Sequence, residues 1–97
     1  MIIFIDIDET ICNTSEDRNY KAAVPIIENI NKANELYENG HTIIYWTARG
    51  TTTGIDWRKI TEEQFAGWGV KYHDLQFGKP YYDLFIDDKN MNTRDWT

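Results

Sequence analysis

Hydrophobic residues gather in short runs that are separated by polar stretches. The first run, Ile2-Ile3-Phe4-Ile5, continues through Asp6-Ile7 to Asp8, and an unbroken apolar run of this kind is typical of a buried parallel strand. It predicts a strand over about 2–7. Similar runs predict strands over about 42–47 and 83–88, and a short strand over 72–77.

Two longer segments show helical spacing of their apolar residues. A helix is predicted over about 24–38, with Pro25 in its first turn and Gly40 just beyond its end. Its apolar stripe comprises Ala23, Ile26, Ile27, Ile30, Ala33, Leu36 and Tyr37. A second helix is predicted over about 57–67. Its core residues are Ile60, Phe65 and Trp68, and it stops at Gly69.

The remaining segments, 9–22, 50–56 and 89–97, are polar and predict loops. Alternating strands and helices predict an α/β fold with a mostly parallel sheet, Rossmann-like and three-layered (α/β/α), in a single domain over 1–97. Right-handed crossovers place the carboxyl ends of such strands at one edge, where ligands bind. We therefore expect a cluster at that edge, made of Asp6, Asp8, Thr47, Asp87 and Asp88.

Composition narrows the classes of partner. The net charge of −6 disfavours nucleic acid and acidic membranes as partners. No stretch reaches the roughly 20 apolar residues that span a bilayer, and the first apolar run is too short for a signal peptide. The single Cys12 excludes an internal disulfide and suits a reducing cytosol, so we expect a cytoplasmic protein.

Asp6 and Asp8 lie on one face where the first strand ends, because side chains two residues apart on a strand point the same way. Two close carboxylates repel each other unless a cation lies between them or one of them holds a proton. Both situations belong to chemistry on phosphate. In isolation, such a pair is also compatible with a turn that caps a helix.

Three further motifs follow in order: Thr47-Ala48-Arg49-Gly50 after the second strand, Lys79-Pro80, and Asp87-Asp88 after the last strand. Together with Asp6-Ile7-Asp8-Glu9-Thr10, they resemble the haloacid dehalogenase superfamily of aspartate-nucleophile phosphatases. Each motif is weak alone, but the four in this order extend over positions 2 to 88.

The resemblance implies the roles of the site residues. Asp6 is the expected nucleophile and Asp8 the general acid, a role that needs a raised pKa. Lys79 supplies a fixed positive charge, and Thr47 with the N–H of Ala48 holds a phosphoryl oxygen. Arg49 is expected either to bind the substrate phosphate or to form a surface ion pair.

The resemblance also implies a Mg²⁺ ion. Its expected ligands are the Asp6 carboxylate, the Asp8 main-chain carbonyl and an aspartate of the last motif. Asp88 takes the usual metal-binding position of the family, and Asp87 is a direct or indirect ligand.

The segments between the motifs leave no room for a cap domain, so the site is expected to be open or closed by a neighbouring subunit of a homo-oligomer. The ending Lys-Pro-Tyr-Tyr-Asp-Leu-Phe-Ile-Asp-Asp-Lys is similar to small bacterial phosphatases of capsule or surface-polysaccharide synthesis. This similarity implies a sugar phosphate or a related small molecule as substrate. Alternatives are a protein or polynucleotide phosphatase, phosphotransfer to an acceptor other than water, and a non-catalytic binding domain.

Overall fold

The computed structural model describes residues 1–97 and has an α/β fold. Three parallel strands form the main sheet in the order β1 (Ile2–Ile5), β4 (Thr42–Trp46) and β5 (Asp74–Gln76). The connections carry α1 (Ile27–Glu38) and α2 (Arg58–Trp68). The predicted fold class, an α/β domain with a mostly parallel sheet and no cap, is confirmed.

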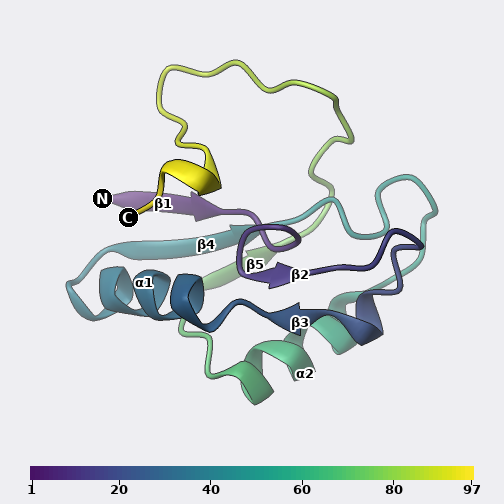
Figure 1. Ribbon diagram of the computed structural model, residues 1–97, viewed down its shortest axis with the longest axis horizontal. Helices are drawn as coiled ribbons and strands as arrows, with labels where there is room; N and C mark the ends of the chain where they lie inside the picture. The colour runs from purple at the N-terminus through teal and green to yellow at the C-terminus, as the bar shows by residue number, and fades with distance from the viewer.

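Both helices pack on one face of the sheet (Figure 1). The register pairs Ile3 with Ile43 and Ile5 with Tyr45, so these side chains share a face. They form the core together with residues from both helices and from the loop after β1, including Ile7, Ile11, Ile30, Ala33, Phe65 and Leu75. The opposite face carries Ile2, Phe4, Ile44 and Trp46. No helix of the chain forms a third layer there.

The segment between β1 and α1, expected as a loop, contains a small hairpin. β2 (Cys12–Asn13) pairs antiparallel with β3 (Val24–Pro25), and the short helix η1 (Tyr20–Ala22) lies between them. Because Pro25 belongs to β3, helix α1 begins at Ile27 rather than at 24. The second helix ends as predicted, since Gly69 adopts the left-handed conformation that closes it.

The predicted strand over 83–88 is wrong. Residues 80–92, here called the arm, contain no regular structure and are exposed. The arm leaves the body after Gly78, arcs away from it and returns to the short helix η2 (Thr93–Asp95) near β1 (Figure 1). β1 is therefore an edge strand of the sheet. No helix of the chain is long and apolar enough to cross a membrane.

Candidate active site at the carboxyl edge of the sheet

Asp6 and Lys79 meet at the carboxyl edge of the sheet, as the sequence predicts. Asp6 directly follows β1, and its side chain is 40% exposed. The Lys79 Nζ lies 3.7 Å from Asp6 Oδ1. The backbone fixes this approach, because the Lys79 N–H donates to the Thr47 carbonyl oxygen over 3.1 Å. The ammonium also lies over the Trp46 and Tyr82 rings, 5.6 and 5.5 Å from their centroids.

The charge state of Asp6 depends on two opposing influences. Burial raises the pKa of its carboxyl above the usual value, and the Lys79 ammonium and the Ile7 N–H offset part of that rise. A partly exposed carboxylate beside a fixed cation is suited to attack on an anionic substrate, because the cation reduces the repulsion between the two anions.

Asp8 is held by Arg49. Arg49 Nη2 donates to Asp8 Oδ1 over 2.9 Å and Arg49 Nε donates to Asp8 Oδ2 over 3.0 Å, which is a bidentate arrangement. The Thr14 hydroxyl donates to Oδ1 over 2.6 Å. Although burial opposes ionisation, these donors lower the pKa of the Asp8 carboxyl. The raised pKa that a general acid needs is therefore not found for Asp8.

Arg49 forms an ion pair with Asp8, but the pair is buried and not at the surface as expected. Binding of the substrate phosphate by Arg49 stays a prediction. The residue is 2% exposed. Its Nη1 donates to the Thr61 hydroxyl over 3.0 Å and to Gln64 Oε1 over 2.7 Å. The guanidinium also lies over the Tyr20 ring at 4.9 Å. Arg49 thus joins the loop after β1 to α2 and η1.

Sequence reasoning missed these partners of Arg49. Thr61, Gln64 and Phe65 lie on one side of α2 by their spacing, and Thr61 is fully buried although it is polar. A polar pair inside the apolar stripe of a helix is the signal that could have identified them. Thr14 and Tyr20 lie in the irregular segment 9–22 and give no comparable signal.

The Thr47 side chain is buried, and its hydroxyl oxygen accepts a hydrogen bond from the Arg49 N–H over 3.1 Å. This bond shapes the turn that follows β4. The Ala48 N–H, in contrast, has no hydrogen-bond partner within the chain. The Gly50 N–H is likewise without a partner, so two backbone donors of this motif are available for an anionic oxygen.

Hydrogen bonds from distant segments hold the loop after Asp8. Glu9 adopts a left-handed backbone conformation with φ of 64°, and its N–H donates to the Cys12 carbonyl over 2.8 Å. The Thr10 hydroxyl bonds to the Thr93 hydroxyl over 3.0 Å, and the Asn29 side-chain amide donates to the Thr10 carbonyl. Thr10 therefore ties the loop to α1 and to η2.

The acidic residues gathered here do not form a complete metal site. No group of three or more His, Cys, Asp or Glu side chains is placed to hold a metal ion. Arg49 holds the Asp8 carboxylate, whereas the ligand expected from this residue is its main-chain carbonyl. Asp87 and Asp88 lie exposed in the arm, so their predicted place beside Asp6 is wrong for a single chain. Asp6 supplies one carboxylate, whereas Mg²⁺ is usually bound by one or two carboxylates together with phosphate oxygens and water.

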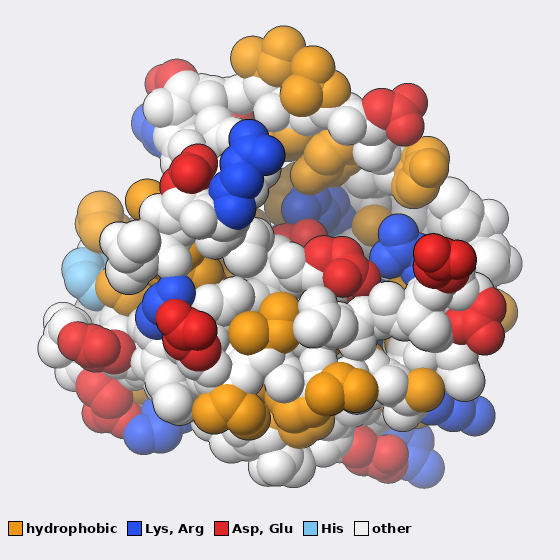
Figure 2. Space-filling view, viewed as in Figure 1, with side chains coloured by type: hydrophobic (Ala, Val, Ile, Leu, Met, Phe, Trp, Pro, Cys, Tyr) orange, Lys and Arg blue, Asp and Glu red, His pale blue; other side chains and the backbone are white.

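Two hollows lie near the site. An open hollow of about 160 Å³ lies between the 50–56 loop and the residues that precede Lys79, with Trp57, Phe77 and Gly78 in its wall. Figure 2 shows a further hollow between the arm and the body, with basic and acidic side chains on its floor. The first borders Gly78, which directly precedes Lys79 in the chain.

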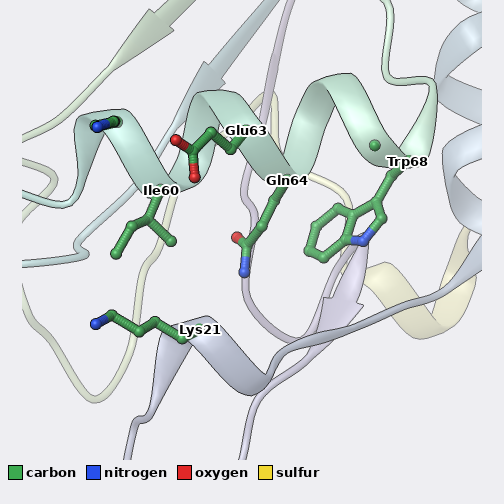
Figure 3. A pocket seen from close by; sticks show the side chains of 7 residues that line it. Lys21, Ile60, Glu63, Gln64 and Trp68 are labelled. Atoms are coloured by element: carbon green, nitrogen blue, oxygen red, sulfur yellow. The ribbon is translucent and has the colours of Figure 1, made fainter.

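A shallow groove between η1 and α2 is larger (Figure 3). It is lined by Lys21, Lys59, Ile60, Glu63, Gln64, Gly67 and Trp68. Gln64 stands behind the site rather than in it, because its amide nitrogen donates to the Tyr20 carbonyl and its oxygen accepts from Arg49. The groove contains none of the residues that the motifs single out.

Comparison with known proteins gives a structural relationship. No protein-family model matches the chain, and no curated protein matches it. The chain is similar to the crystal structure of a structural-genomics target from Vibrio cholerae, with a TM-score of 0.86 and 25% sequence identity. The match covers 99% of this chain and 87% of the other.

Proposed function

We propose that this protein is a phosphatase that hydrolyses phosphoesters through an aspartyl-phosphate on Asp6. The observation that carries the proposal is the pair formed by Asp6 and Lys79 at the carboxyl edge, 3.7 Å apart. Both residues occupy motif positions by which the chain resembles the haloacid dehalogenase superfamily. The unpartnered Ala48 N–H adds a donor for phosphoryl oxygen beside them.

In the first step, an Asp6 carboxylate oxygen attacks phosphorus and forms the P–O bond of the aspartyl-phosphate. The bond from phosphorus to the leaving oxygen breaks, and that oxygen takes a proton from solvent water. Lys79 and the Ala48 N–H stabilise the charge on the phosphoryl oxygens. In the second step, water attacks phosphorus, phosphate leaves and Asp6 regains its carboxylate.

The structure limits what Asp8 does in this scheme. Its pKa is lowered and it is held by Arg49, so it is ionised at neutral pH and has no proton to donate. An ionised carboxylate is suited to accept a proton from the attacking water in the second step. Protonation of the leaving group by Asp8 requires that Arg49 first release it.

Mg²⁺ is part of the proposal as the ion that the resemblance implies, and it would supply positive charge to the phosphoryl group. Asp6 is the residue of this chain that would contact it. Because one chain does not gather a full ligand set, no step of the mechanism is assigned to the ion.

A small phosphorylated metabolite, such as a sugar phosphate, is the proposed substrate class. The 160 Å³ hollow with Trp57 and Phe77 in its wall is small compared with common ligand pockets of about 300–1,000 Å³. It suits a small leaving group rather than a long polymer.

A phosphate-release screen tests the proposed function. The panel contains sugar phosphates, nucleotides and phosphopeptides, each with and without Mg²⁺, and compares the wild type with Asp6→Asn. The exposed Asp95→Asn is the matched control, because it removes one carboxylate far from Lys79 in the sequence. Hydrolysis that is lost in Asp6→Asn and kept in Asp95→Asn supports the proposal. Equal activity of the two variants contradicts it.

A further inference from the structure

The arm and the outer face of the sheet expose an unusual number of large apolar side chains. In the arm, Tyr81 is 71% exposed, Leu84 75% and Ile86 87%. On β1, Ile2 is 70% and Phe4 53% exposed. Tyr82, Phe85 and Met91 extend the exposed set.

A chain of contacts connects part of this exposed set to the candidate site. Phe4 packs edge-on against Trp46, with 6.0 Å between ring centroids. The Lys79 ammonium lies over both Trp46 and Tyr82, which connects the sheet to the arm. Tyr82 in turn contacts Phe85 at 5.3 Å. A partner that covers this surface therefore approaches the residue that pairs with Asp6.

The area of this surface matches a dimer interface. Eight apolar or aromatic side chains of roughly 200 Å² each, exposed by 40% to 87%, present on the order of 1,000 Å². The largest apolar patch of a typical monomer is about 300–600 Å², whereas a stable interface buries about 800 Å² on each partner. The surface is thus large enough for a second protein molecule.

The arm is too short to pair with the open edge of β1 in its own chain and also place Asp87 beside Asp6. The backbone of Lys79 is bound to Thr47 at the carboxyl edge. A parallel strand that ends at Asp87 has to start near Asp83, with Asp83 level with Ile2. That position is on the order of 18 Å from Lys79, measured along and across the sheet. Four residues span at most about 14 Å. An arm from another molecule has no such restriction.

We infer that a second copy of this chain covers this surface, and that each arm completes the site of its partner. Residues 84–86 of one copy add to the open edge of the partner's β1, and Asp87 and Asp88 come to lie beside the partner's Asp6. The exchange is symmetric, so one interface completes two sites. The role given to Asp87 and Asp88 rests on the proposed function, whereas the association of two copies does not depend on it.

The exchange accounts for the shortage of metal ligands in one chain. The sequence predicts a strand over about 83–88 from the apolar run 84–86, and in a single chain this run has no strand to pair with. An edge strand that presents free N–H and C=O groups is a template for pairing with another chain. In the exchanged dimer, the apolar run is buried and three aspartates meet at one edge.

Sedimentation velocity tests the association. The wild type is compared with the double variant Leu84→Asp/Ile86→Asp, and with Ile27→Asp as the control. Ile27 is 55% exposed at the start of α1, so its replacement adds charge away from the arm. The wild type and the control should sediment as dimers, and the arm variant as a folded monomer by circular dichroism. A monomeric wild type, or an arm variant that remains dimeric, overturns the inference.

Complementation tests the shared site. Asp6→Asn and Asp87→Asn/Asp88→Asn are each expected to lack activity and to bind Mg²⁺ weakly by calorimetry. If the arms are exchanged, a mixed dimer has one site with both wild-type halves, so an equimolar mixture regains about a quarter of the wild-type activity and tight Mg²⁺ sites. A mixture that regains neither activity nor tight Mg²⁺ binding overturns the shared site.

Failure of the proposed function gives a different result. If the wild type hydrolyses no phosphoester, sedimentation and the calorimetric recovery of Mg²⁺ binding in the mixture still decide whether arms are exchanged. If the wild type hydrolyses phosphoesters as a monomer, the exchange is refuted and the proposed function stands.

Discussion

Arg49 and Asp8 form a buried bidentate ion pair, with 2.9 Å from Nη2 to Oδ1 and 3.0 Å from Nε to Oδ2. The Arg49 side chain is fully buried and that of Asp8 is 13% exposed. Breaking such a pair by removing one partner leaves an uncompensated charge away from water. The pair therefore determines the stability of the loop that carries both motif aspartates.

Arg49→Met should destabilise the protein by about 3–5 kcal/mol, because the Asp8 carboxylate then loses its counter-charge while it stays largely buried. Arg94→Met is the matched control, since Arg94 is exposed. Urea unfolding followed by Trp fluorescence measures both. Equal midpoints for the two variants would show that the ion pair contributes nothing to stability.

The pH dependence of stability should have opposite signs for the two motif aspartates in metal-free buffer. The pKa of Asp8 is lowered from 3.8, so its contribution is present above that value and is lost as the pH falls through its lowered pKa. The pKa of Asp6 is raised from 3.8, so its ionisation costs stability as the pH rises through the range above 3.8.

Asp8→Asn should accordingly destabilise at neutral pH, and Asp6→Asn should stabilise there. Both differences from the wild type should shrink as the pH falls. Unfolding free energies from urea titrations across this pH range, with EDTA present, give the comparison. Destabilisation by both variants at neutral pH would refute the assigned direction for Asp6.

The sequence predicts which residues lie at the ends of strands, but it does not predict which side chains from other elements pack against them. The meeting of Asp6 and Thr47 at one edge follows from the rule that carboxyl ends of parallel strands meet, whereas the place of Lys79 beside Asp6 is implied by the family resemblance. The position of Arg49 does not follow in this way. It depends on Thr61, Gln64 and Tyr20, which come from three-dimensional packing.

The strand expected over 83–88 shows a different limit. Its apolar run has the right composition. However, Lys79 is bound at the carboxyl edge of the sheet, whereas a parallel strand would have to begin at the amino end of β1. Composition indicates what a segment prefers, whereas the reach of the chain decides which partner it finds. The hairpin of β2 and β3 was missed because its strands have two residues each.

Cys12 should react slowly with thiol reagents in the folded protein. The residue is fully buried, and burial together with the Asp8 carboxylate raises the pKa of its thiol to about 12. Because the thiolate is the reactive form, a chromogenic disulfide reagent at about pH 8 should label Cys12 only after unfolding in urea. Rapid labelling of the folded protein would contradict the packing around Cys12.

Gly50 should tolerate substitution less well than Gly54. Both have positive φ, 79° and 77°, so alanine is strained at either position by about 1–2 kcal/mol. At Gly50 an added Cβ would also lie 2.1 Å from the Ile55 carbonyl oxygen, whereas at Gly54 it meets nothing within 4 Å. Thermal unfolding should show the larger loss for Gly50→Ala. Equal losses would mean that the 50–56 loop adjusts freely.

The central claim is that Asp6 forms a covalent phosphoryl intermediate, and chemical trapping tests it most directly. The protein is mixed with the best substrate from the phosphate-release screen, quenched in acid and treated with borohydride, which reduces an aspartyl-phosphate to homoserine. Peptide mass spectrometry then locates the change. The account predicts homoserine at position 6 in the wild type and none in Asp6→Asn. Turnover with an unmodified Asp6, or with homoserine at another aspartate, would contradict it.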